Sequence, residues 1–198
     1  DSQGRKFGKS EGNAMYLDKN KTSMYSFYQF FMRSEDADVI RYLKAFTFLP
    51  LEQIAELEEQ VRVAPEKREA QRVLAADVVR RVHGEEGLRQ AVQASEVLFG
   101  GSIEGMSAAD LIPIFADAPS AEVEAGEVMN NQLSKLAVAS GLCKSVGEVR
   151  RLADGGGFYV NNKRASGQDV LTEDMLVDGE VLVLRSGKKN YRLVKLVK

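Results

Sequence analysis

Several residue types are scarce in this chain, and each scarcity excludes a class of protein. The 198 residues contain one cysteine, Cys143, and one histidine, His83. A single cysteine excludes an internal disulfide and fits a reducing compartment. We expect no metal site, because structural zinc is held mainly by cysteine and histidine. No apolar run reaches the roughly 18 residues of a membrane span, and the polar first residues predict that there is no signal peptide.

Charge is plentiful but unevenly distributed. Residues 1–34 carry 6 Lys/Arg and 3 Asp/Glu, residues 35–129 carry 9 and 19, and residues 130–198 carry 12 and 7. The net charge of −2 therefore hides a basic C-terminal region that follows an acidic body. A positive segment of this kind steers a protein toward a polyanion. The acidic body alone is typical of a solvated helical surface.

Hydrophobic periodicity predicts a loop over residues 1–22 and an all-α bundle over residues 23–118. The expected helices are about 23–33, 35–47, one opened by Pro50, 65–83, 85–99, and a short one capped by Ser107 and Asp110. Gly84 and the pair Gly100-Gly101 are the expected helix stops. The aromatic side chains of the first helix favour a core position over a base-stacking surface.

The pattern changes after the bundle. Residues 119–129 are poor in apolar side chains and predict a linker. Residues 130–198 predict a small α+β domain, so the fold class is mainly α with a small α+β C-terminal domain. Its expected elements are a helix at 132–140, a helix opened by Ser145 and Glu148, a glycine stop at 155–157, a strand at 158–160, a turn at 161–162, and strands at 180–185 and 191–197.

One short motif carries recognisable chemistry. Lys6, Lys9 and Ser10 lie on a loop with Gly4 and Gly8. Two ammonium groups and a hydroxyl suit a polyphosphate, but three residues separate the glycines where a Walker A loop requires four. No hydrophobic strand precedes the loop. The residues alone therefore favour a flexible basic loop over a P-loop.

The sequence Lys6-Phe7-Gly8-Lys9-Ser10 resembles the KMSKS signature of class I aminoacyl-tRNA synthetases, in the form typical of bacterial-type tyrosyl-tRNA synthetases. The resemblance extends over essentially the whole chain. It is carried by Leu17-Asp18, Lys21-Thr22-Ser23, Asp38 to Lys44, Ala64 to Arg68, and Val82 to Glu86. It implies a helical anticodon-recognition domain over residues 23–118 and a signature loop left from a catalytic domain over residues 1–22.

The resemblance also implies roles for the loop. Lys9 would be the main contact to the phosphates of ATP, Lys6 a second contact and Ser10 a supporting hydroxyl, with magnesium as the counter-ion of ATP. The catalytic domain of the family, with its HIGH signature, is missing, and a first residue Asp1 in place of methionine suggests a fragment. We therefore expect the fragment to be inactive alone and to bind no cofactor. The parent would dimerise through the missing domain, and the fragment would be a monomer.

Residues 130–198 resemble the α-L RNA-binding module, which forms the C-terminal domain in the same family. Shape and phosphates are what such a module reads on structured RNA. The candidate RNA-binding residues are Lys135, Lys144, Ser145, Arg150, Arg151, Lys163 and Arg164. The hairpin residues Arg185, Lys188, Lys189 and Arg192 are weaker candidates, because a basic hairpin tip is often only solvated.

These expectations lead to one main hypothesis and one alternative. The main hypothesis is the tRNA-binding region of a tyrosine–tRNA ligase, whose parent acts in the bacterial cytoplasm, a mitochondrion or a chloroplast. The alternative is an RNA-binding protein of the same family that acts on other structured RNA, for example in intron splicing. His83, before Gly84, fits a helix end better than a catalytic role, and Cys143 fits a small buried hydrophobe.

Overall fold

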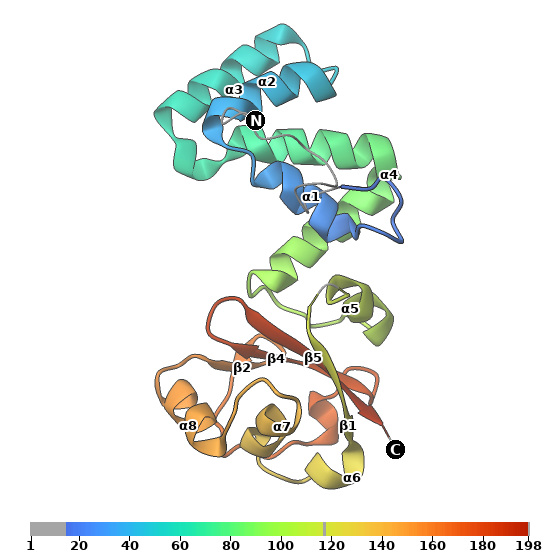
Figure 1. Cartoon of the computed structure of the whole chain (residues 1–198), viewed down its shortest axis with the longest axis vertical. Helices are drawn as coiled ribbons and strands as arrows, with labels where there is room; N and C mark the ends of the chain where they lie inside the picture. Colours follow the sequence, from blue (N-terminus) through green and yellow to red (C-terminus); the bar gives the residue numbers. More distant parts are fainter. Residues whose placement is uncertain (1–14, 117, 198) are drawn as a thin grey trace. The chain divides into compact units, whose positions relative to one another are not determined.

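The structure is a computed structural model that describes residues 15–116 and 118–197 (Figure 1). The chain forms two compact units, Asp1–Ser95 and Glu96–Lys198. The first unit is helical, and the second combines helices with a five-stranded sheet. This agrees with the expected fold class of a helical bundle followed by a small α+β domain.

The first unit is built from helices whose ends match local signals in the sequence. Its elements are α1 (Met24–Met32), α2 (Asp36–Phe46), α3 (Leu51–Val63), η2 (Pro65–Lys67) and the first part of α4 (Glu69–Leu98). Ser23 caps α1, because its side chain accepts a hydrogen bond from the backbone N–H of Ser26. Pro50 occupies the N-cap position of α3, where its missing N–H costs nothing.

The aromatic residues of α1 lie in the core, as predicted. Phe27 and Tyr28 are buried, and the ring of Phe27 meets Phe31 edge to face at a centroid distance of 5.5 Å. Leu43 of α2 and Leu74 of α4 are fully buried in the same cluster. Burying such side chains is worth about 1.5–3 kcal/mol each, so this cluster is what holds the four helices together.

Helix α4 starts later than the sequence predicts and contains the predicted break. Arg68 adopts a left-handed conformation (φ 52°), and its guanidinium donates to the carbonyls of Met32 and Ser34, at 2.8 Å each. The helix therefore begins at Glu69 rather than at Pro65. Gly84 has φ 75° inside α4, which agrees with its predicted role as a helix stop.

The second unit contains the end of α4 and all of the strands. Its other elements are α5 (Ala108–Ile114), β1 (Ser120–Glu124), α6 (Ala125–Val128), α7 (Leu133–Ala139), α8 (Val146–Asp154), β2 (Phe158–Val160), β3 (Lys163–Arg164), η3 (Glu173–Met175), β4 (Val181–Ser186) and β5 (Asn190–Val197). The strand order is β1-β5-β4-β2-β3. Strand β1 runs parallel to β5, and the other pairs are antiparallel.

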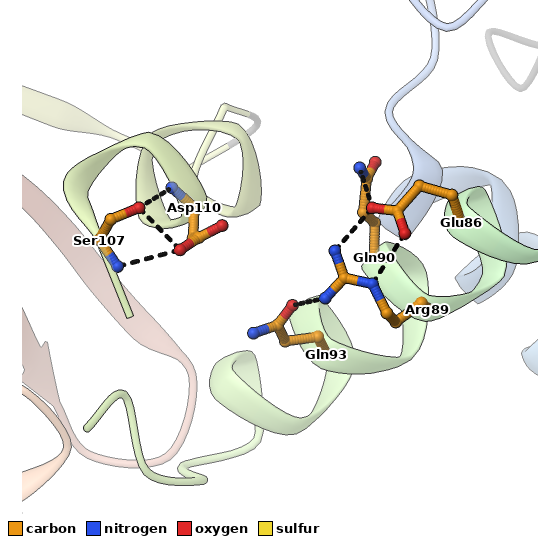
Figure 2. A network of polar contacts seen from close by, with 6 residues as sticks. All are labelled: Glu86, Arg89, Gln90, Gln93, Ser107 and Asp110. Atoms are coloured by element: carbon orange, nitrogen blue, oxygen red, sulfur yellow. Dashed lines mark hydrogen bonds and ion pairs between the residues drawn. The ribbon is translucent and has the colours of Figure 1, made fainter. Parts of the chain in front are cut away.

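Both predicted capping serines are in place. Ser107 and Asp110 form a reciprocal capping box at the start of α5, with Ser107 Oγ accepting from the Asp110 N–H and Asp110 Oδ2 accepting from the Ser107 N–H (Figure 2). Ser145 caps α8 by accepting from the Glu148 N–H at 3.2 Å. The Glu148 carboxylate, however, accepts from the N–H of Lys144 at 2.8 Å and not from Ser145.

The sheet is covered on both of its faces (Figure 1). Helices α7 and α8 cover one face, where Leu136, Val149, Leu182 and Leu184 share a buried cluster. Residues of the other face, such as Val181 and Val183, are also fully buried, because the chain from 96 to 116 packs there. Strand β4 consequently reads as an uninterrupted apolar run.

The linker prediction for residues 119–129 is wrong. The structure places strand β1 and helix α6 there, and β1 pairs with β5 from Ser120 to Glu124. A strand at the sheet edge needs few apolar residues, since only Val123 of β1 is buried. The boundary between the two compact units lies instead within α4, after Ser95.

None of the helices in the described part of the chain combines the length and apolar character that a bilayer span requires. The described residues also contain no group of three or more His, Cys, Asp and Glu side chains that could hold a metal ion.

Candidate nucleic-acid interface

The predicted catalytic residues Lys6, Lys9 and Ser10 lie outside the described residues. The described chain begins soon after them, with a turn that ends at α1. In this turn the N–H of Tyr16 donates to Thr22 Oγ1 at 3.1 Å, and the N–H groups of Lys21 and Thr22 donate to the carbonyl of Asp18. Thr22 is buried, so this turn is fixed onto the first unit.

The predicted RNA-binding residues of the second unit lie on α7, α8 and the β2–β3 hairpin. Leu133, Leu136 and Val149 point into the core, which leaves the opposite sides of the two helices exposed to solvent. The predicted cations Lys135, Lys144, Arg150, Arg151, Lys163 and Arg164 are all exposed. Folding therefore presents the whole set on the surface of one unit.

Guanidinium groups lie beside two glycines at the two ends of α8. A methyl group added to Gly147, in the first turn, would lie 3.9 Å from an Nη atom of Arg151. One added to Gly156, just beyond the last turn, would lie 3.4 Å from Cζ of Arg164. Gly156 also has φ 68°, a backbone conformation that favours glycine. The guanidinium group of Arg151, a residue of the last turn, therefore reaches back to the first turn, and that of Arg164 lies beyond the other end of the helix.

The cations at these positions differ from the arginines of the first unit in how they are paired. Among the described residues of the first unit, the side chains that form ion pairs with a carboxylate within 4.0 Å include Arg41, Arg62, Arg68, Arg72, Arg80, Arg81 and Arg89. Figure 2 shows one of these pairs, in which Glu86 accepts from Arg89 and from Gln90. By contrast, the charged groups of Lys144, Arg150, Arg151 and Arg164 make no hydrogen bond or ion pair to any described residue.

Two of the predicted lysines have weak partners. Lys135 Nζ donates to Asn131 Oδ1 at 3.1 Å, and Lys163 Nζ lies 3.8 Å from the Glu104 carboxylate. Both lysines are exposed, and an exposed pair of this kind contributes about 0–1 kcal/mol. A phosphate could therefore displace either partner at little cost.

The nearby carboxylates are used by backbone groups. Glu148 accepts from the N–H of Lys144, Asp169 from that of Ser166, and Asp178 from that of Ala108. Ser145 Oγ is likewise occupied as an acceptor by the α8 cap, which leaves its hydroxyl proton as the one available donor. These three carboxylates form no ion pair with Lys144, Arg150, Arg151 or Arg164 among the described residues.

Two of the weaker candidates are wrong as free surface cations. Arg185 is buried, with its guanidinium carbon 3.7 Å from the ring centre of Tyr159. Arg192 is partly buried and donates to the carbonyl of Gly141 at 3.0 Å. Lys188 and Lys189 are exposed at the β4–β5 turn, as expected. The sequence alone could not distinguish the two buried or bonded arginines from the two exposed lysines, because the residues that the arginines contact are distant in the chain.

The lone histidine and cysteine have structural positions. The ring of His83 meets Phe27 edge to face at 5.1 Å, and burial together with the charge of Lys19 lowers its pKa. Cys143 is buried, and burial raises the pKa of its thiol. A protonated, buried thiol is a poor nucleophile, which agrees with the prediction of a small core residue.

Comparison with known proteins supports the interpretation of both units. The family described as tRNA synthetases class I (W and Y) matches residues 1–100. The chain belongs to this class I tRNA synthetase family. A second family, described as the tyrosine–tRNA ligase SYY-like C-terminal domain, matches residues 110–194. Within the class I synthetases, this second match points to the tyrosine branch.

Individual tyrosine–tRNA ligases are similar to this chain over most of its length. The tyrosine–tRNA ligase of Geobacillus stearothermophilus is 47% identical over 197 residues, which are 98% of this chain and 46% of that protein. Tyrosine–tRNA ligase 1 of Bacillus anthracis is 44% identical over 195 residues, with the same coverage. The chain thus spans about half the length of the curated relatives it matches.

Solved structures of the family cover less of the chain. A C-terminally truncated mitochondrial tyrosyl-tRNA synthetase from Aspergillus nidulans is 41% identical over 44% of this chain and 26% of that one, with a TM-score of 0.42. The corresponding enzyme from Coccidioides posadasii is 44% identical over 44% of this chain and 24% of that one, with a TM-score of 0.40.

Proposed function

We propose that this chain is the tRNA-binding region of a tyrosine–tRNA ligase. The parent enzyme attaches tyrosine to its tRNA with ATP, by way of tyrosyl-adenylate. The helices of residues 23–95 serve anticodon recognition, and the second unit binds tyrosine tRNA through its basic surface. The chain matches about half of its relatives' length, and it does not aminoacylate by itself.

The observation that carries this proposal is the unpaired charge around α8. Lys144, Arg150, Arg151 and Arg164 are exposed on one unit and lack carboxylate partners among the described residues. Phosphate contacts by such side chains release counterions and dominate the affinity for RNA. Guanidinium groups also bind phosphate oxygens with two parallel N–H groups. Lys135, Lys163 and the hydroxyl of Ser145 complete the proposed surface.

The signature loop belongs to the parent's chemistry. Two ammonium groups and a hydroxyl suit the charge that develops on a pyrophosphate leaving group. In the parent, Lys9 contacts the phosphates of ATP, Lys6 provides a second positive charge and Ser10 supports them with its hydroxyl, while magnesium accompanies ATP. The parent is a homodimer through its catalytic domain, and this chain is a monomer. Its compartment is the bacterial cytoplasm or an organelle.

The test is a titration of tyrosine tRNA into the 198-residue chain at several salt concentrations. The double change Lys144→Ala with Arg150→Ala should lower the affinity strongly and reduce the slope of log K against log salt by about 2, or 1 per lost phosphate contact. Lys195→Ala is the matched control, since Lys195 is an exposed cation of the same unit that lies opposite Glu122 on β1, outside the proposed surface. Equal slopes for all three proteins would refute the assignment.

Two further measurements separate the alternatives. Tyrosine-dependent pyrophosphate exchange by the chain alone should be absent, and robust exchange would show that the catalytic machinery is complete. Competition between tyrosine tRNA and a structured intron RNA should favour the tRNA. Preference for the intron would support the RNA-binding alternative.

A further inference from the structure

The second face of the sheet, opposite α7 and α8, is closed by a segment that the sequence analysis assigned to the helical bundle. Residues 96–116, here called the strap, comprise the last turn of α4, helix α5 and the loop that joins them (Figure 1). The buried apolar side chains of the strap are Val97, Ile103, Ala108, Leu111, Ile114 and Phe115. The ring of Phe115 lies 5.5 Å from that of Tyr191 on β5.

Under the strap lies a row of cross-strand neighbours. Tyr159 of β2 pairs with Arg185 of β4, and Arg185 pairs with Tyr191 of β5. Residues opposite one another on adjacent strands share a face of the sheet. The Arg185 guanidinium lies over Gly100 of the strap, since a methyl group added there would be 3.3 Å from Nη1. The strap therefore covers the buried side chains of Arg185 and Tyr191, whereas Tyr159 beside Arg185 is only partly buried.

A first group of hydrogen bonds holds the end of α4 against the sheet. Asn162 donates from Nδ2 to the carbonyls of Val97 and Gly101, at 2.8 Å each. The hydroxyl of Tyr191 donates to the Val97 carbonyl at 3.2 Å. The Val97 carbonyl also accepts from the N–H of Gly100 at 3.0 Å, so the side chains of Asn162 and Tyr191 add bonds from the sheet to the turn that ends α4.

A further hydrogen bond holds the start of α5. Asp178 accepts from the N–H of Ala108, the first residue of that helix, through Oδ2 at 2.7 Å. This N–H also lacks a partner within its helix. A hydrogen bond to a carboxylate is stronger than one between two neutral groups. One carboxylate therefore fixes the point where the strap turns into α5.

Asn162 and Asp178, which make these hydrogen bonds, both lie in turns of the second unit and have a left-handed backbone conformation. Asn162 has φ 60° and Asp178 has φ 51°. Glycine would satisfy such a backbone best, and asparagine and aspartate tolerate it. A glycine would, however, supply none of the three hydrogen bonds to the strap. The side chains of Asn162 and Asp178 thus hold the strap by hydrogen bonds, in addition to tolerating the conformation of their turns.

We infer that Asn162 and Asp178 act as two clasps, and that the strap opens as one element when they are released. Opening uncovers Arg185 and Tyr191 without breaking the strand pairs of the sheet. The α7 and α8 side of the domain keeps its own buried cluster, so that side stays folded.

Hydrogen exchange of the 198-residue chain, read by mass spectrometry, tests the clasps. Asn162→Gly and Asp178→Gly should each speed amide exchange in residues 102–115 by about tenfold or more, while β4 and β5 exchange as before. Asn130→Gly is the matched control, since Asn130 also has a left-handed backbone (φ 58°) but makes no side-chain hydrogen bond to the described residues. Asp178→Asn, which keeps an acceptor oxygen, should restore most of the protection.

Other outcomes would overturn the inference. Unchanged amide exchange in the strap would mean that the hydrogen bonds of Asn162 and Asp178 do not keep the strap closed. Equal acceleration of the strap, β4 and β5, including a variant that fails to fold, would mean that the strap is an inseparable part of the sheet domain. Acceleration by Asn130→Gly equal to that of the clasp variants would assign the effect to backbone freedom alone.

Discussion

The guanidinium carbon of Arg185 lies 3.7 Å from the ring centre of Tyr159 and 5.6 Å from that of Tyr191. Arg185 is buried, and its Nε has no hydrogen-bond partner in the described part of the chain. The attraction between a cation and aromatic faces strengthens when water is excluded. These contacts make Arg185 a stacked core residue of the second unit, in contrast to the exposed arginines of α8.

Replacing Arg185 by alanine should therefore destabilise the second unit. We expect a loss of about 2 kcal/mol or more, because the variant loses both cation–π contacts and the packing of the aliphatic stem. Urea denaturation followed by tyrosine fluorescence and circular dichroism measures it. Arg150→Ala is the control and should change stability by less than about 0.5 kcal/mol. Equal stability of the two variants would contradict the stacked role of Arg185.

Gly100 should not tolerate a side chain. It has φ 96°, and an added methyl group would approach Nη1 of Arg185 to 3.3 Å. Its neighbour's N–H, from Gly101, donates to the carbonyl of Glu96 at 2.8 Å, which closes α4 in the way helices commonly end with a left-handed glycine. Gly100→Ala should cost about 1–3 kcal/mol in thermal or urea denaturation.

Gly126→Ala is the matched control for that change. Gly126 is exposed on α6, and a methyl group there would meet nothing within 4 Å. The replacement should be neutral or stabilising by a few tenths of a kcal/mol, since alanine favours helix. A control as damaging as Gly100→Ala would mean that neither the left-handed backbone nor the Arg185 contact matters.

The stability of the first unit should depend on pH through His83. Burial, with the charge of Lys19, lowers the pKa of His83 in the folded state below the ordinary value of 6.5. The unfolded chain then binds the proton more readily. Stability is full above about pH 6.5 and falls as the pH drops from there toward the folded-state pKa.

His83→Gln removes this titration and should flatten the same pH range. Urea midpoints of the first unit between pH 5 and pH 8 provide the comparison. The wild-type midpoint should fall more steeply on acidification than that of the variant. Parallel curves would exclude His83 as the source of the dependence.

Arg151 and Arg164 should contribute to RNA binding independently of each other, because their guanidinium groups lie at opposite ends of α8. Each alanine variant should reduce the salt slope of tRNA binding by about 1, and the double variant by about 2. Melting temperatures should remain close to the wild-type value, since neither side chain has an ion-pair partner among residues 15–116 and 118–197. A slope unchanged in either single variant would remove that arginine from the interface.

Local signals made most of the secondary structure predictable. Serine caps at Ser23, Ser107 and Ser145 marked helix starts correctly, and Gly84 and Gly100 marked a break and an end. Each of these depends on hydrogen bonds or backbone angles within a few residues. The cations of α7 and α8 were also found as exposed residues, because amphipathic periodicity identifies the solvent side of a helix.

The errors arose where partners are distant in the sequence. Strand β1 is stabilised by β5, some 70 residues later in the chain, and nothing in residues 119–129 indicates that pairing. The strap was assigned to the bundle for the same reason. One signal could have indicated it: Val181-Leu182-Val183-Leu184 is apolar at every position, which is typical of a strand covered on both faces.

The place of β5 in the sheet sets when the second unit can fold during synthesis. Strand β5 lies between β1 and β4 in the sheet, although it follows every other strand along the chain. A ribosome therefore releases β1 long before the neighbour that β1 needs has been made. Sheets that depend on such distant pairs fold slowly, and exposed strand edges invite association with other chains. The helices of the first unit, whose contacts are formed from earlier residues, can be complete before that exposure ends.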